Sequence, residues 1–188
     1  MIWEEHAVYF TEATLKSALD IGGLTLERFE RFPQALEDSL VVIGRAGDEA
    51  RPAAPADEPP QAEVASFLAY AEGLESTRRA VRERLSRAGR VAVFGAGHLS
   101  CCYINLLGLA DRIEFVVDDH PRKQGLFMPG SGRPVLGSQA LTERGVSLCL
   151  MGLSPDIEDK IMAANQAFLQ AGGQFASLIP ASPRRLEP

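Results

Sequence analysis

The sequence of 188 residues predicts an α/β fold, with a parallel sheet and flanking helices over residues 89–180. The first observation is a short apolar strand, 90–95, that runs directly into Gly95 and Gly97. The second is another apolar strand, which ends on Asp118 about twenty residues later. The third is the alternation of strand and helix patterns through this region, which implies right-handed crossovers between parallel strands. We therefore expect a Rossmann-like sheet.

The elements around these two strands follow from the hydrophobic pattern. A long helix is expected over residues 62–88, because apolar residues recur at intervals of three and four and Gly89 then ends the run. The remaining elements are expected as a helix at 98–109, a strand at 113–118, a loop at 120–134, a helix near 138–144, a strand at 146–151, a helix at 155–171 and a strand at 174–179.

Residues 1–45 predict a helix followed by a β-hairpin. Thr11 is expected to cap the start of the helix and Gly22 to follow its end. A strand at 24–31 alternates apolar and charged residues, whereas a strand at 39–44 is continuously apolar. One helix and a hairpin cannot enclose a core alone, so this segment is expected to need a partner surface.

A linker is expected between the two parts. Residues 46–61 are rich in proline, alanine and charge and cannot bury enough apolar surface to offset the entropy of ordering them. The predicted organisation is therefore 1–45 for the helix and hairpin, 46–61 for the linker, and 62–188 for the long helix with the Rossmann-like domain.

Composition sets further expectations about partners and location. The net charge of −6 argues against general nucleic-acid binding, and the arginines of residues 78–90 are expected to form a solvated helix face. No apolar run approaches the ~20 residues that span a bilayer, and no signal-peptide pattern opens the chain, so we expect a cytoplasmic protein. Three cysteines without a zinc spacing predict reduced, buried thiols and no metal site.

The glycine pair predicts a nucleotide site at the carboxyl end of the first parallel strand. In a dinucleotide site, Gly95 and Gly97 would let the backbone approach a pyrophosphate, and Asp118 would bind ribose hydroxyls. The third glycine of that fingerprint is replaced by Ser100. A Gly-x-Gly pair alone is weak evidence, and Asp118 at a strand end is equally suited to capping a turn.

Two cationic or titratable side chains lie near this glycine pair in the sequence. Lys123, in a loop flanked by glycine, is a candidate phosphate partner, and the alternative is a solvated loop lysine. His98, in the first turn of a helix, faces either a ligand or water.

Two stretches carry a resemblance to a known family. The residues Trp3–Thr11 with the following helix and hairpin, and the stretch Val91–Pro180, resemble the three-domain, S-adenosylmethionine-dependent sugar C-methyltransferases that act on nucleotide-linked keto-deoxysugars. The most specific segments are Phe94–Gly97 and Val116–Gly130, the latter matching a family pattern of Val-Asp, Lys-Gln-Gly and Pro-Gly.

The resemblance implies that the two parts of the chain belong to different domains of the family's enzymes. Residues 1–45 would be the final helix and last two strands of a class I methyltransferase domain, and the closing part would be the substrate domain. Neither the family's zinc-binding segment nor its methyl-donor loop is found in this sequence. S-adenosylmethionine is therefore expected on a missing domain or a partner chain, with no cofactor bound by this chain alone.

The resemblance also implies catalytic residues near the start of the chain. A Tyr-x-Glu-His element of the family is assigned to proton transfer at the sugar, and here Glu5 and His6 match it while Trp3 replaces the tyrosine. Methylation beside a ketone first requires removal of a proton, and a histidine of near-neutral pKa suits that task. The alternative is that these are polar residues at a frayed end.

The sequence thus supports two interpretations. In the first, the chain is the nucleotide-sugar-binding portion of a sugar C-methyltransferase that needs a partner chain, a homodimer or missing domains for methyl transfer. In the second, it is a stand-alone nucleotide-binding or protein-interaction module with vestigial methyltransferase ancestry. An NAD-dependent oxidoreductase is a weaker third interpretation, because no second catalytic cluster is visible.

Overall fold

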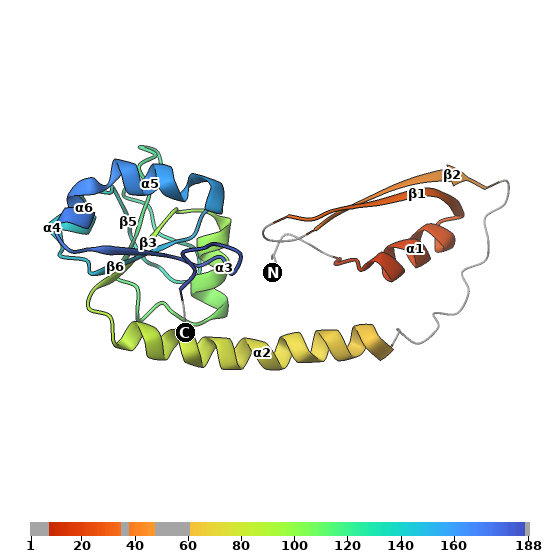
Figure 1. Ribbon diagram of the computed structural model, residues 1–188, viewed down its shortest axis with the longest axis horizontal. Helices are drawn as coiled ribbons and strands as arrows, with labels where there is room; N and C mark the ends of the chain where they lie inside the picture. The colour runs from red at the N-terminus through yellow and green to blue at the C-terminus, as the bar shows by residue number, and fades with distance from the viewer. Residues whose placement is uncertain (1–7, 35–37, 48–60, 187–188) are drawn as a thin grey trace. The chain divides into compact units, whose positions relative to one another are not determined.

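The computed structural model describes residues 8–34, 38–47 and 61–186 (Figure 1). The chain divides into two compact units, Met1–Tyr70 and Ala71–Pro188, and the division falls inside helix α2 (Gln61–Ser86). Most of the expected linker lies outside the described residues, so it stays a prediction.

The first unit contains α1 (Glu12–Ile21), β1 (Leu24–Phe32) and β2 (Ser39–Ala46). Thr11 caps α1 as predicted, since its side chain accepts a hydrogen bond from the N–H of Thr14, and Gly22 is the C-cap. The two strands pair as an antiparallel hairpin whose register shifts between Leu26 and Arg28.

Side chains of this hairpin unit remain accessible to solvent. Within residues 8–34 and 38–47 none is buried. Several large apolar side chains are exposed, namely Val8, Tyr9, Phe10, Ile21, Phe32, Val41 and Ile43. Because apolar burial is the main favourable contribution to folding, these described residues have no core of their own.

The second unit is built on a five-stranded parallel sheet. Its strands are β3 (Val91–Phe94), β4 (Phe115–Val117), β5 (Val135–Leu136), β6 (Leu148–Met151) and β7 (Gln174–Ser177). They are ordered β5-β4-β3-β6-β7, and every neighbouring pair is parallel. The chain leaves β3 toward β4 and later returns to the other side of β3 with β6. This reversal between β3 and β6 is the topological switch point at which α/β sheets bind ligands.

Helices cover both faces of the sheet (Figure 1). Along β3, Val91 and Val93 join one core with α2 and α3 (His98–Leu106), while Ala92 and Phe94 join a second core with α4 (Ala140–Glu143), α5 (Glu158–Ala164) and α6 (Gln166–Gln170). A strand buried on both faces reads as a continuous apolar run, which is the pattern that predicted it. The predicted Rossmann-like α/β fold is confirmed.

Two local predictions need correction. Strand β5 was not predicted; its two residues pair with Val116 and Val117 of β4. The single helix expected over 155–171 is wrong, because the segment forms a 3-10 turn (Pro155–Ile157), α5 and α6. Helix α5 ends at Ala164, and the side-chain amide of its C-cap, Asn165, donates to the carbonyl of Ile161 at 2.8 Å. A side chain that bonds to the backbone four residues earlier competes with the helical ladder.

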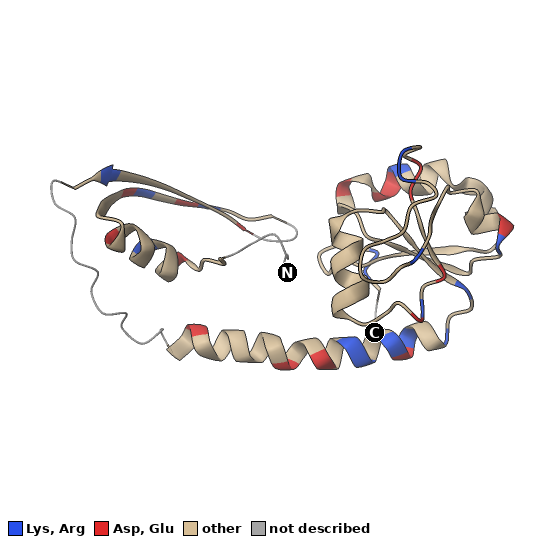
Figure 2. Ribbon diagram, turned by 180° about the vertical axis from the view of Figure 1, so that it is seen from behind, with Lys and Arg blue, Asp and Glu red and all other residues tan. Residues whose placement is uncertain are grey.

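The arginines of α2 also differ from expectation. They gather on the C-terminal half of the helix (Figure 2), and two of them bind the neighbouring α3 region. Arg78 donates to the carbonyl of Leu106 at 2.7 Å, at the end of α3, and Arg82 makes a two-point contact of 2.8 Å with Asp111. Positive charge at a helix C-terminus is favourable, so these side chains fasten α2 to α3.

Cys149 and Cys102 are buried and Cys101 is half-buried. Burial raises the pKa of the Cys149 thiol, which keeps it protonated and unreactive. Across the described ranges, no group of three or more His, Cys, Asp or Glu side chains is arranged to hold a metal ion. No helix in those ranges has the length and apolar character needed to cross a membrane.

Candidate functional site

Five of the predicted site residues come from two loops at the carboxyl ends of adjacent strands. Gly95, Gly97 and His98 follow β3, and Asp118 and Lys123 follow β4. Since β3 and β4 are hydrogen-bonded parallel neighbours, their following loops leave the sheet at the same edge. We call residues 95–97 the glycine loop.

Gly95 is required by the fold itself. Its φ of +103° lies in a region that L side chains rarely adopt. A Cβ at this position would lie 2.6 Å from Cγ of Leu153, in the loop after β6. Its N–H donates to the carbonyl of Val117 at 2.7 Å, which ties the start of the glycine loop to the end of β4.

Gly97 is not required in this way. Its backbone is extended, with φ −127° and ψ −179°, and any residue can adopt this conformation. A Cβ built on Gly97 would meet no atom within 4 Å. Gly97 is also the N-cap of α3, where glycine provides no side-chain hydrogen bond. The absent side chain therefore leaves open space in front of the first turn of α3.

Ser100 occupies the position where the dinucleotide fingerprint has its third glycine. It is buried on α3, with its hydroxyl 3.4 Å from the carbonyl oxygen of Gly152. A Cβ on Gly152 would lie only 2.1 Å from the Ser100 oxygen. Helix α3 therefore still packs closely against the segment after β6. The glycine that allows this contact is Gly152, opposite the helix, and not a residue of the helix itself.

Asp118 joins the two loops through its carboxylate. Its Oδ2 accepts the N–H of Ala96 at 3.0 Å and the ammonium of Lys123 at 2.9 Å. Its Oδ1 accepts the N–H of His120 at 2.9 Å, in a turn of the kind that aspartate favours. The side chain is only 14% exposed. Most of its hydrogen-bonding capacity is thus used within the chain.

The pKa of Asp118 reflects these contacts. Burial on its own raises the pKa of a carboxyl group, because it disfavours the charged form. Here the hydrogen bond from Lys123 and those from the backbone N–H groups of His120 and Ala96, together with the positive charge of Lys123, lower the pKa below its ordinary value. Asp118 is therefore a carboxylate at neutral pH.

Lys123 contacts this carboxylate, whereas His98 contacts Cys102. The side chain of Lys123 is 43% exposed, so its ammonium contacts both Asp118 and solvent. His98 is half-buried at the start of α3, and its Nε2 lies 3.6 Å from the sulfur of Cys102 one turn later.

Sequence reasoning missed the residues that fix the loop after β4. Gln124 donates to the backbone carbonyl of Asp118 at 3.1 Å, and Asp119 accepts the N–H of Ser138 at 2.8 Å. The signal was present in the Lys-Gln-Gly segment, since its lysine and glutamine both bind Asp118. Glu5 and His6, the predicted catalytic pair, lie outside the described residues.

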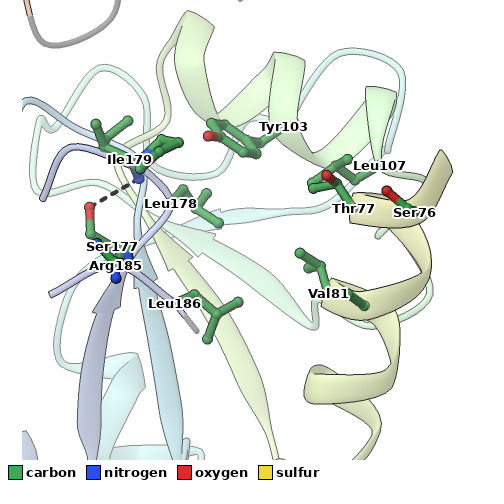
Figure 3. A pocket seen from close by; sticks show the side chains of 12 residues that line it. Ser76, Thr77, Val81, Tyr103, Leu107, Ser177, Leu178, Ile179, Arg185 and Leu186 are labelled. Carbon is green, nitrogen blue, oxygen red and sulfur yellow. Dashed lines mark hydrogen bonds between the residues drawn. The ribbon is translucent and has the colours of Figure 1, made fainter. Parts of the chain in front are cut away.

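A cavity of about 430 Å³ lies elsewhere in the second unit, between α2, α3 and the segment after β7 (Figure 3). Its walls are mostly apolar, with Val81, Leu107 and Leu178 among them, and the charged residue that lines it is Arg185. None of the five site residues that the structure describes lines this cavity. Its apolar character suits a charged diphosphate less well than the glycine loop does.

The chain was compared with protein families and with solved structures. The model of the C-methyltransferase C-terminal domain family matches residues 57–180, which is most of the chain. Among solved structures, the chain is similar to RSP, a Rex-family repressor, with 14% sequence identity and a TM-score of 0.41. That similarity covers 71% of this chain and 59% of the repressor chain, so the matched region is less than two thirds of the repressor's length. No curated protein matches the sequence.

Proposed function

The chain belongs to the C-methyltransferase C-terminal domain family, and on this basis we propose that it is the substrate-side portion of a sugar C-methyltransferase. In this proposal it binds the nucleotide part of a nucleotide-linked sugar. The binding site is the carboxyl edge of β3 and β4, formed by Gly95, Gly97, His98, Asp118 and Lys123.

Gly97 is the observation that carries the proposal. A glycine in extended backbone, with no atom near its missing side chain, is not explained by the packing of the chain. A diphosphate that must approach the backbone closely does explain it, because any side chain at this position would project into the space that the ligand needs. The position also lies beside the switch point between β3 and β6, where ligands of this fold class bind.

The neighbouring groups suit a diphosphate. The first turn of α3 presents backbone N–H groups at a helix N-terminus, which attracts anions. In the glycine loop, the N–H groups of Gly95 and Ala96 are bound by Val117 and Asp118. Lys123 adds a positive charge at the same edge, beside Asp118. Gly95 supports this arrangement indirectly, by allowing the turn that ends β3.

Methyl transfer requires a donor site in addition to this substrate site. We propose that S-adenosylmethionine is bound by a further domain or by a partner chain, and that Glu5 and His6 then act at the sugar. His6 would remove the proton beside the ketone, and Glu5 would orient the imidazole and stabilise its charged form.

The hairpin unit supports the need for a partner. Its described residues bury no side chain, although several are large and apolar. A methyltransferase domain or a second copy of this chain would cover them. The sequence predicts reduced thiols, and we propose a cytoplasmic location.

Calorimetric titration of the full chain tests the proposal. We expect saturable binding of uridine or thymidine diphosphate and no binding of S-adenosylmethionine by this chain alone. Binding of neither diphosphate would contradict the substrate role and favour a protein-interaction module. Tight binding of S-adenosylmethionine would contradict the separation of the donor and substrate sites.

A further inference from the structure

We propose that Asp118 is a positioning residue that holds Lys123 beside the glycine loop, and that it does not bind the ribose of the ligand. This inference rests on the proposed function, because it concerns how the same site recognises a nucleotide. In this proposal, this edge of the sheet recognises the diphosphate of the ligand and not its ribose hydroxyls.

One oxygen atom connects the two loops. Oδ2 of Asp118 accepts both the N–H of Ala96, at the centre of the glycine loop, and the ammonium of Lys123. The positive charge of Lys123 is thereby fixed within two hydrogen bonds of the backbone that faces the proposed ligand. A lysine side chain can adopt many rotamers, and restricting them costs entropy. Because the contact with Asp118 already restricts Lys123 in the free protein, less entropy is lost when the ligand binds.

The same contacts leave Asp118 poorly suited to bind a ribose. Its second oxygen accepts the N–H of His120, and the side chain is 14% exposed. A carboxylate that binds ribose hydroxyls needs an oxygen directed to the ligand. Here three donors from the chain itself already converge on the two oxygens, so a hydroxyl pair would have to displace at least one of them.

The proposal requires Lys123 to be the group through which Asp118 acts. In the free protein Lys123 pairs with Asp118, and 43% of its side chain remains exposed. A diphosphate carries more negative charge than one carboxylate. The ammonium of Lys123 can therefore contact the phosphate while it stays close to Asp118.

Three probes separate the two roles of Asp118: inorganic pyrophosphate, uridine diphosphate and 2′-deoxyuridine diphosphate. We expect Asp118→Asn to weaken the binding of all three by the same factor, about ten-fold, as for the loss of one charge-assisted hydrogen bond. Asp119→Asn is the matched control. It removes a neighbouring negative charge, while the amide oxygen can still accept the N–H of Ser138 that fixes the loop, so it should leave the three affinities unchanged.

A double-mutant cycle then tests whether Asp118 acts through Lys123. Lys123→Ala should also cost about ten-fold, and adding Asp118→Asn to it should cost little more, because the group that Asp118 positions is gone. A merely structural role of Asp118 would weaken binding by the same factor in both backgrounds. Arg122→Ala is the control for loss of a positive charge on the same loop.

The outcomes are distinct. The inference is overturned if Asp118→Asn leaves pyrophosphate binding unchanged, if it selectively weakens the ribonucleotide, or if its effect persists without Lys123. Should Asp118→Asn fail to fold by circular dichroism, the unmodified protein still decides, since it must bind the ribo- and deoxyribonucleotide within two-fold of each other. If the unmodified protein binds none of the probes, the proposed function fails as well, whereas binding with an unaffected Asp118→Asn variant overturns only this inference.

Discussion

Gly95 and Gly97 lie two residues apart at the carboxyl end of β3, and their surroundings differ. Gly95 has a positive φ and faces Leu153, whereas Gly97 has an ordinary backbone and faces open space. Substitutions at the two positions therefore separate the requirements of the fold from those of the ligand.

Gly95→Ala should destabilise the chain by about 1–3 kcal/mol, because it combines an unfavourable φ with a methyl group 2.6 Å from Cγ of Leu153. Urea unfolding measures this change. Gly97→Ala is the matched control and should cost less than about 1 kcal/mol, since only the N-cap preference changes. Equal destabilisation by the two variants would contradict the structural role given to Gly95.

Gly97→Asp should move stability and binding in opposite directions. Aspartate is a favourable N-cap, so the melting temperature should stay the same or rise. Nucleotide binding should be lost in a calorimetric titration, since a negative charge would occupy the space proposed for the diphosphate. Gly97→Asn, a neutral cap of similar size, should weaken binding less. Undiminished binding to Gly97→Asp would place the diphosphate elsewhere.

The lowered pKa of Asp118 predicts how stability depends on pH. A carboxylate whose pKa is lowered on folding stabilises the native state above its unfolded value, about 3.9, and loses this contribution as pH falls through the lower folded value. Asp118→Asn should therefore unfold more easily than the unmodified chain at neutral pH, by about 1–2 kcal/mol.

The measurement is the difference in unfolding free energy between these two proteins as a function of pH. It should be constant above about pH 5 and shrink in more acidic solution. A difference that grows as pH falls would mean that the pKa of Asp118 is raised on folding.

At the scale of the element, the sequence predicts those helices, strands and caps that depend on neighbouring residues in the chain. The N-cap at Thr11 and the buried strands β3, β4 and β6 follow from side chains within a few residues. The two-residue strand β5 could not be found, because its pairing with β4 is non-local. The site shows the same limit. The sequence pointed to Asp118 and Lys123, but the contact of Asp118 with both Lys123 and Ala96 depends on how the two loops meet.

The arginines of α2 also make contacts with a distant segment that local sequence does not predict. Arg78→Ala should destabilise the second unit by about 1 kcal/mol, because it removes a charged donor from the carbonyl of Leu106 at the end of α3. The exposed neighbour Arg79→Ala is the control and should have little effect. Thermal unfolding compares the two variants, and equal melting temperatures would return Arg78 to the solvated face that the sequence predicted.

At the scale of the whole molecule, burial is unequally distributed along the chain. The second unit has one hydrophobic core on each face of its sheet, while residues 8–34 and 38–47 bury no side chain. In hydrogen exchange of the full chain, we expect the amides of β1 and β2 to exchange much faster than those of β3, β4 and β6. Comparable protection of the hairpin would show that another surface, such as a second copy, already covers it.

The central claim is that a nucleotide diphosphate binds at the carboxyl edge of β3 and β4. Titration of the isotopically labelled full chain with uridine diphosphate, followed by the backbone amide resonances, tests this claim most directly. We predict saturable shifts at Ala96, Gly97, His98 and Lys123, with little change at the cavity residues Val81 and Leu178. Shifts confined to the cavity residues, or no shift at the glycine loop, would contradict the account.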